Sequence, residues 1–236
     1  MRIQRLLVLA ALMLSATAGF AQDEEGFSGR AGLGYLSTTG NTETESMNLN
    51  FEMGWNYTTW HHRFAGLAVR SSTSDMTTAE AYGLNWKTDY DISETTYWYG
   101  LVAWDKDEFS AYNQQIREAL GYGRHFIQTE RHDLNGEVGA GVRQADLRDG
   151  TTQDDTILRL SGEYTWTISE TSRFGQTLAV EGGSDNTYTE ATSSLGVDIN
   201  DDLALVVSYT IKSNSDVLPG TEKTDTYTSV TIEYSF

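Results

Sequence analysis

Polar and apolar side chains alternate strictly through residues 46–57. Met47 and Leu49 begin the apolar series, and Asn48 and Asn50 begin the polar one. Because successive side chains of a β-strand point to opposite faces, this period of two predicts a strand with one apolar and one polar face. A helix would need a hydrophobic period of about 3.6 residues, and the period here is two.

The same period recurs along the chain, with turn residues between the repeats. We predict twelve strands, at residues 27–37, 44–57, 61–71, 79–90, 96–105, 113–127, 132–145, 155–168, 172–182, 188–199, 203–212 and 225–236. The connections alternate in length, with short turns at 58–59, 92–96, 128–131, 168–171 and 200–202. Longer polar loops are expected at 38–43, 71–78, 105–112, 146–154, 183–187 and 213–223. This arrangement predicts an all-β, transmembrane, antiparallel up-and-down barrel with short periplasmic turns and longer extracellular loops.

Aromatic residues near both ends of the strands support a membrane barrel. The expected belts are Trp55, Tyr57, Trp60, Tyr90, Tyr97, Phe126, Trp166, Phe174, Tyr234 and Phe236 toward the short turns, and Tyr35, Tyr82, Trp104, Tyr112, Tyr188 and Tyr227 toward the long loops. Such belts mark the two interfaces of a bilayer. A secreted β-sandwich would explain the alternation equally well, but it would explain neither the belts nor the inward glycines.

The first residues read as a secretory signal peptide. Arg2 and Arg5 precede an apolar run, and small residues near Ala18 and Ala21 offer cleavage sites. We therefore divide the chain into a signal peptide at 1–21, an acidic tail at 22–26 and a barrel at 27–236. The formal net charge of −18 argues against nucleic acid as a partner, since nucleic-acid binding needs basic patches.

If the apolar face meets lipid, the other face lines the lumen. The expected lumenal charges are Arg30, Arg70, Lys87, Arg117, Arg143, Arg159, Arg173 and Lys212 with Glu52, Asp89, Asp133, Glu137, Glu163, Glu181, Glu190, Asp198 and Glu233. Two arrangements remain open. The charges either pair across a narrow, mostly closed interior or form separate walls along a water-filled path.

Three further features are open at the level of sequence. The expected strand at 96–105 is apolar on both faces, so its orientation is undecided, and Glu118 and Gln176 fall on the lipid face. The inward glycines either leave room in the lumen or allow a small barrel to curve. They are Gly32, Gly34, Gly121, Gly123, Gly139 and Gly141.

No enzyme, metal or cofactor site stands out. The four histidines, His61, His62, His125 and His132, all lie near the short turns, and no nucleophile with a base or phosphate-binding glycine loop is evident. Acidic residues of the long loops could supply oxygen ligands to Ca²⁺ or Mg²⁺, but no twelve-residue calcium loop is present. These residues are Asp105, Asp107, Glu108, Asp146, Asp149, Asp154 and Asp155.

Three stretches resemble one known family. Residues 32–42 with the strand that follows, residues 97–124 and residues 134–142 are similar to the salt-induced outer-membrane proteins of the YdiY type. The chain also ends on spaced apolar residues, Val230, Ile232, Tyr234 and Phe236, which resemble the signal read by the bacterial barrel-assembly machinery. The resemblance implies an outer-membrane barrel of a Gram-negative bacterium and supplies no catalytic or ligand residues.

Three functions follow as hypotheses. The first is a narrow passive channel or an envelope-maintenance protein under osmotic or salt stress. The second is a non-conducting surface protein whose acidic loops bind a partner, divalent ions or lipopolysaccharide. The third, an outer-leaflet lipid-modifying enzyme, lacks the required site. In each case the expected partners are outer-membrane lipids and lipopolysaccharide, and the barrel-assembly machinery during biogenesis.

Overall fold

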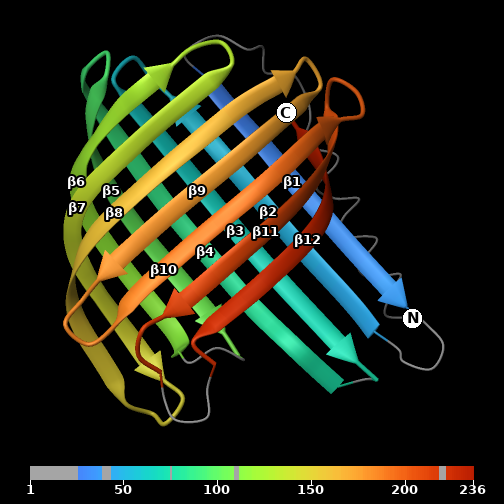
Figure 1. Cartoon of the computed structure of the whole chain (residues 1–236), viewed down its shortest axis with the longest axis vertical. Helices are drawn as coiled ribbons and strands as arrows, with labels where there is room; N and C mark the ends of the chain where they lie inside the picture. The colour runs from blue at the N-terminus through green and yellow to red at the C-terminus, as the bar shows by residue number, and fades with distance from the viewer. Residues whose placement is uncertain (1–25, 39–43, 75, 109–111, 218–221) are drawn as a thin grey trace.

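The chain folds into a closed antiparallel barrel of twelve strands (Figure 1). The computed structural model describes residues 26–38, 44–74, 76–108, 112–217 and 222–236. The expected signal peptide and most of the acidic tail lie outside these ranges. Each strand pairs with its neighbours in sequence, and β12 closes antiparallel onto β1, as an even number of strands requires. The predicted fold class is confirmed.

The strands follow the period-two segments of the sequence. Their bounds are β1 Gly26–Thr38, β2 Thr44–Asn56, β3 Trp60–Thr73, β4 Met76–Ser93, β5 Thr96–Asp107, β6 Tyr112–Gln128, β7 His132–Leu147, β8 Thr152–Ser169, β9 Ser172–Gly182, β10 Thr187–Asp198, β11 Leu203–Asn214 and β12 Thr224–Ser235. Several strands run further than expected, and the connection between β3 and β4 is reduced to residues 74–75. The loop expected at 71–78 is rich in serine and threonine, and threonine suits a strand as well as a loop. No helix in the described ranges is long and apolar enough to cross a membrane.

One rim of the barrel carries the chain's end and the tight turns. Gly29 and Phe236 exchange backbone hydrogen bonds of 2.8 and 2.9 Å there, and we call this end the C-terminal rim. Turns at 57–59, 94–95, 129–131, 170–171 and 199–202 share it. At the other end, called the opposite rim, lie the last residues of β1, β3, β5, β7, β9 and β11 and the first residues of β2, β4, β6, β8, β10 and β12.

The outer face is apolar, as expected. On β3, however, the residues that face the lumen and the outside are the reverse of those predicted. Arg63 on β3 bonds to Glu163 on β8, so it points into the lumen. Arg70 lies seven residues away and therefore points outward, because side chains alternate along a strand. The prediction of Arg70 as a lumenal charge was wrong. Of the two polar residues expected outside, Gln176 accepts a hydrogen bond of 2.5 Å from Ser193.

Glu118 keeps its outward position between Val102 and Val142 on the neighbouring strands. The register of β6 does shift, between Tyr112 and Gln114 and again between His125 and Ile127. Neither shift brings the Glu118 side chain into the lumen, and it is exposed on the outer face.

Strand β5 turns its tyrosines inward. Tyr97 and Tyr99 are 3% and 2% exposed, and they pack in the lumen with Ala119. Their rings lie over Gly123, Gly121 and Gly139, at the places that glycine Cβ atoms would occupy. These inward glycines therefore make room for two rings. Tyr97, with Tyr112, Tyr188 and Tyr227, was expected in the aromatic belts but faces the lumen instead.

Replacing Gly123 with alanine should destabilise the barrel. A Cβ there would meet the ring of Tyr97 and nothing more rigid, so the ring must move within a packed interior. We expect a loss of about 1–3 kcal/mol in the free energy of unfolding, as is typical of overpacking. Denaturant titration of protein folded into phospholipid vesicles would measure it. Gly182→Ala is the matched control, because nothing lies within 4 Å of that Cβ. Equal effects at both positions would contradict the packing role of Gly123.

Candidate functional site: the lumen

A continuous chain of ion pairs runs through the lumen, from β4 to β11. Starting from Asp89, carboxylates and cations alternate through eight side chains, and we call this set the ion-pair chain. It runs through Asp89, Lys87, Glu137, Arg159, Glu181, Arg117, Asp105 and Lys212. Its separations are 2.7 Å for the two Lys87 contacts and between 3.3 and 3.9 Å for most of the others. Four carboxylates thus balance four cations, which a narrow interior requires.

Glu137 is the most highly bonded member of this chain. Besides Lys87 and Arg159, its carboxylate accepts hydrogen bonds from Tyr97 at 3.0 Å and Ser161 at 2.9 Å. The inward tyrosines also lie beside cations: the Lys87 ammonium is 5.2 Å from the centre of the Tyr97 ring. This part of the lumen is filled with charged and aromatic groups that bind one another.

A second buried cluster fixes the opposite rim. Arg143, 2% exposed, donates to Asp155 and to the backbone oxygen of Asn186, both at 3.1 Å. Asp155 also accepts from the backbone and side chain of Ser184. Asn186 then reaches Asn214 at 2.7 Å. The connection at 183–186 is thereby bound to β7, β8 and β11.

Some polar contacts join strands that lie far apart around the barrel. Arg63 on β3 meets Glu163 on β8 at 3.0 Å. At the opposite rim, Lys212 on β11 lies 3.9 Å from Asp105 on β5, and Tyr227 on β12 donates to Asp107 on β5 at 2.8 Å. The void between these rim residues is only about 30 Å³. Side chains therefore leave little free space in the lumen near the opposite rim.

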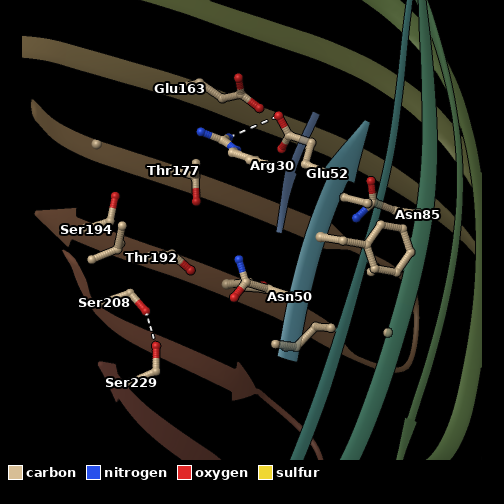
Figure 2. Close-up of a pocket in the computed structure, with 18 of the residues that line it drawn as sticks. Arg30, Asn50, Glu52, Asn85, Glu163, Thr177, Thr192, Ser194, Ser208 and Ser229 are labelled. Atoms are coloured by element: carbon tan, nitrogen blue, oxygen red, sulfur yellow. Dashed lines mark hydrogen bonds and ion pairs between the residues drawn. The ribbon is translucent and has the colours of Figure 1, made fainter. Parts of the chain in front are cut away.

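The lumen also holds a cavity of about 580 Å³ (Figure 2). Figure 2 shows Asn50 of β2 facing hydroxyl groups that come from β9 to β12. Its uncharged polar lining includes Asn48, Asn50, Asn85, Thr165, Thr177, Thr192, Ser194, Ser208, Ser229 and Thr231. Its charges balance, with five basic residues (Arg30, Arg63, Arg117, Arg173 and Lys212) and five acidic ones (Glu52, Asp105, Glu163, Glu190 and Glu233). No sign of charge dominates the cavity.

A second cavity, of about 590 Å³, lies at the C-terminal rim. The two cavities share four lining residues, Arg30, Glu52, Arg173 and Glu233, which we call the neck. Arg30 and Glu52 are directly opposite one another on β1 and β2 and are joined at 3.0 Å. The neck thus combines two positive and two negative side chains.

Most of the lumenal charges proposed from the sequence fall into three groups. The neck or cavity contains Arg30, Glu52, Glu163, Arg173, Lys212 and Glu233. Glu137, Arg159 and Glu181 belong to the ion-pair chain, together with Lys212, and Arg143 belongs to the rim cluster. Asp198, the last residue of β10, is exposed at the C-terminal rim. Sequence reasoning missed Arg63 as a lumenal group and treated Asp105 and Asp155 as loop residues.

The acidic residues assigned to loops do not gather into a cation site in the described part of the chain. No group of three or more His, Cys, Asp or Glu side chains there could hold a metal ion. Asp155 is bound to Arg143 and Ser184. Asp149 accepts hydrogen bonds from the side chain and backbone of Thr151, which lower the pKa of the Asp149 carboxyl. The divalent-ion hypothesis gains no geometric support from these residues.

The histidines are likewise engaged in structural contacts. His61 lies 2.9 Å from Asp91 and 3.1 Å from Asn56 through its two ring nitrogens. His132 contacts the hydroxyl of Tyr164 at 2.9 Å. Neither arrangement places a serine or threonine beside a histidine that is held by a carboxylate, which a hydrolase needs.

Comparison with known proteins places the chain. A family model described as a protein of unknown function, DUF481, matches residues 31–236. The chain belongs to the DUF481 family. An uncharacterized protein of Escherichia coli (strain K12), YdiY, is 29% identical over 216 residues, which cover 91% of this chain and 85% of YdiY. The resemblance stated from the sequence is confirmed.

Solved structures of outer-membrane proteins share the fold. The NanC porin is 11% identical, and the match covers 89% of this chain and 98% of that one with a TM-score of 0.50. The translocator domain of the autotransporter NalP from Neisseria meningitidis is also 11% identical. That match covers 100% of this chain and 95% of the domain with a TM-score of 0.52. Both neighbours are outer-membrane-type barrels, and no enzyme family is shown.

Proposed function

We propose that this barrel is a narrow channel of the bacterial outer membrane for small, uncharged or zwitterionic polar solutes. The observation that carries the proposal is the 580 Å³ cavity, with its balanced charges and its hydroxyl and amide lining, next to a second cavity behind the neck. Hydroxyl and amide groups exchange hydrogen bonds with such solutes without selecting a sign of charge. The C-terminal rim would face the periplasm, as the short turns do in such barrels.

The cross-lumen contacts at the opposite rim fit a channel of low conductance. Lys212–Asp105 and Tyr227–Asp107 connect opposite walls where side chains leave little free space. A solute would have to pass or displace these side chains. We therefore expect small single-channel currents in planar bilayers and passage of small sugars in liposome-swelling assays. Absence of both current and swelling for correctly folded protein would sink the proposal.

The neck should control ion selectivity. Arg173→Glu changes the neck from two positive and two negative groups to one positive and three negative. We expect the reversal potential in a salt gradient to shift toward cation selectivity. The shift should be largest well below 0.1 M salt, where the Debye length exceeds about 10 Å and the charges of the neck are little screened. Arg131→Glu makes the same change of charge at an exposed turn of the same rim. An equal shift in both variants would show that the neck does not line the path.

A further inference from the structure

The junction between β1 and β12 is paired over only part of its length. The two strands are in register over four residue pairs, from Arg30 with Ser235 to Leu33 with Ile232. Beyond Leu33, β1 continues to Thr38, and β12 begins as early as Thr224. In Figure 1 the lower ends of these two strands lie far apart, whereas other neighbouring strands stay together. Strands β1 and β12 are therefore paired only near the C-terminal rim.

The early part of β12 turns toward the lumen. The carbonyl oxygen of Val230 and the amide oxygen of Asn48 lie where an inward Cβ of Gly34 would be. Only glycine permits this approach. Tyr227, three residues earlier, bonds across the lumen to Asp107 on β5. Strand β12 therefore still contacts β1 at Gly34, and the two strands separate beyond this contact (Figure 1).

Unpaired strand edges are costly in hydrocarbon, at several kcal/mol for each backbone group without a partner. The two sides of this seam differ in polarity. Leu33, Tyr35 and Val230 are exposed on the outer face, while the cavity behind them presents the uncharged groups of Asn48, Ser208 and Ser229. A molecule that matches both sides needs an uncharged polar head and an apolar chain.

We infer that the seam is a lateral portal through which an amphipathic molecule binds, with its uncharged hydroxylated headgroup in the cavity and its chain in the adjoining leaflet. The headgroup supplies hydrogen-bond partners to the open strand edges, and the chain lies along the outer face beside Tyr35 and Val230. This goes beyond the proposed channel and does not depend on conduction.

The test locks the seam. Continuing the register of β1 and β12 would place Tyr35 opposite Val230, and the chain has no cysteine of its own. Tyr35→Cys with Val230→Cys would thus zip the seam when oxidised. Tyr209→Cys with Thr228→Cys is the matched control, since these residues already face each other on β11 and β12. The probe is dodecyl glucoside with a diazirine on the sugar, added to protein in phosphatidylcholine vesicles. Labelled peptides are read by mass spectrometry.

With the seam unlocked, we expect the probe to label lumenal residues around Ser208 and Ser229. Oxidation of the Tyr35/Val230 pair should reduce this labelling to the level of a diazirine glucose without the chain, and reduction should restore it. The control pair should have no effect. Ser208→Trp, which fills the cavity, should also abolish lumenal labelling, so the test stands even if the disulfide does not form. Lumenal labelling that is absent without the lock, or unchanged by both locking and filling, would overturn the portal.

Discussion

Replacing Glu137 with alanine should cost the barrel about 3–5 kcal/mol in the free energy of unfolding, the range seen when one partner of a buried ion pair is removed. Glu137 is 8% exposed. Its carboxylate forms ion pairs with Lys87 at 2.7 Å and Arg159 at 3.3 Å. It also accepts hydrogen bonds from two hydroxyl groups. Without it, both cations keep one carboxylate each, Asp89 and Glu181, and the Tyr97 hydroxyl loses its partner. Denaturant unfolding in phospholipid vesicles would measure the loss.

The control for this experiment is Glu130→Ala. Glu130 is exposed in the turn between β6 and β7, and a substitution of that kind changes stability by at most about 0.5 kcal/mol. Glu137→Gln should fall between the two, because the amide keeps the volume and part of the hydrogen bonding but loses the charge. A Glu137→Ala protein as stable as Glu130→Ala would show that the ion-pair chain is solvated and contributes little.

The barrel itself could be predicted because membrane β-strands impose a rule that is visible at every residue. Lipid outside and polar groups inside give the period of two, and residues 46–57 show it without a break. The strand count followed from that repetition and the parity of the closure. The lumenal charges that lie on clearly alternating strands, such as Glu137 and Arg159, were found for the same reason.

The prediction of inward and outward faces failed where consecutive residues are all apolar or aromatic. Strand β5 carries apolar or aromatic residues at Tyr97, Trp98 and Tyr99 in succession, so alternation could not say which ring points inward. Asp105, on the same strand, was consequently placed in a loop and not in the ion-pair chain. A related ambiguity on β3 led to the prediction that Arg70 faces the lumen, whereas Arg63 does so.

Contacts across the lumen were beyond sequence reasoning for a different reason. The bond between Arg63 and Glu163 joins residues on β3 and β8, and it depends on the tilt and stagger that bring them to one height. Period two fixes the face of each side chain and not its height relative to a distant strand. The division of the lumen into an ion-pair chain and a cavity of balanced charge depends on this stagger and was visible only in three dimensions.

The lipid-facing side offers the other large effect. Leu160 lies in the middle of β8, 58% exposed on the outer face and flanked by Val138 and Val180. Leu160→Arg places a cation in hydrocarbon, and we expect a loss of about 2–4 kcal/mol in the free energy of unfolding in vesicles. Ile168→Arg, on the same face but beside the turn at 170–171, should lose only about 0–1 kcal/mol, since the charge reaches the interface. Because the strand, the face and the introduced charge are the same in both variants, the difference between their losses of unfolding free energy reports how deep each position lies in the membrane. Equal losses would mean that the middle of β8 does not lie deeper in the membrane than its end, and the position of the bilayer around this barrel would have to be revised.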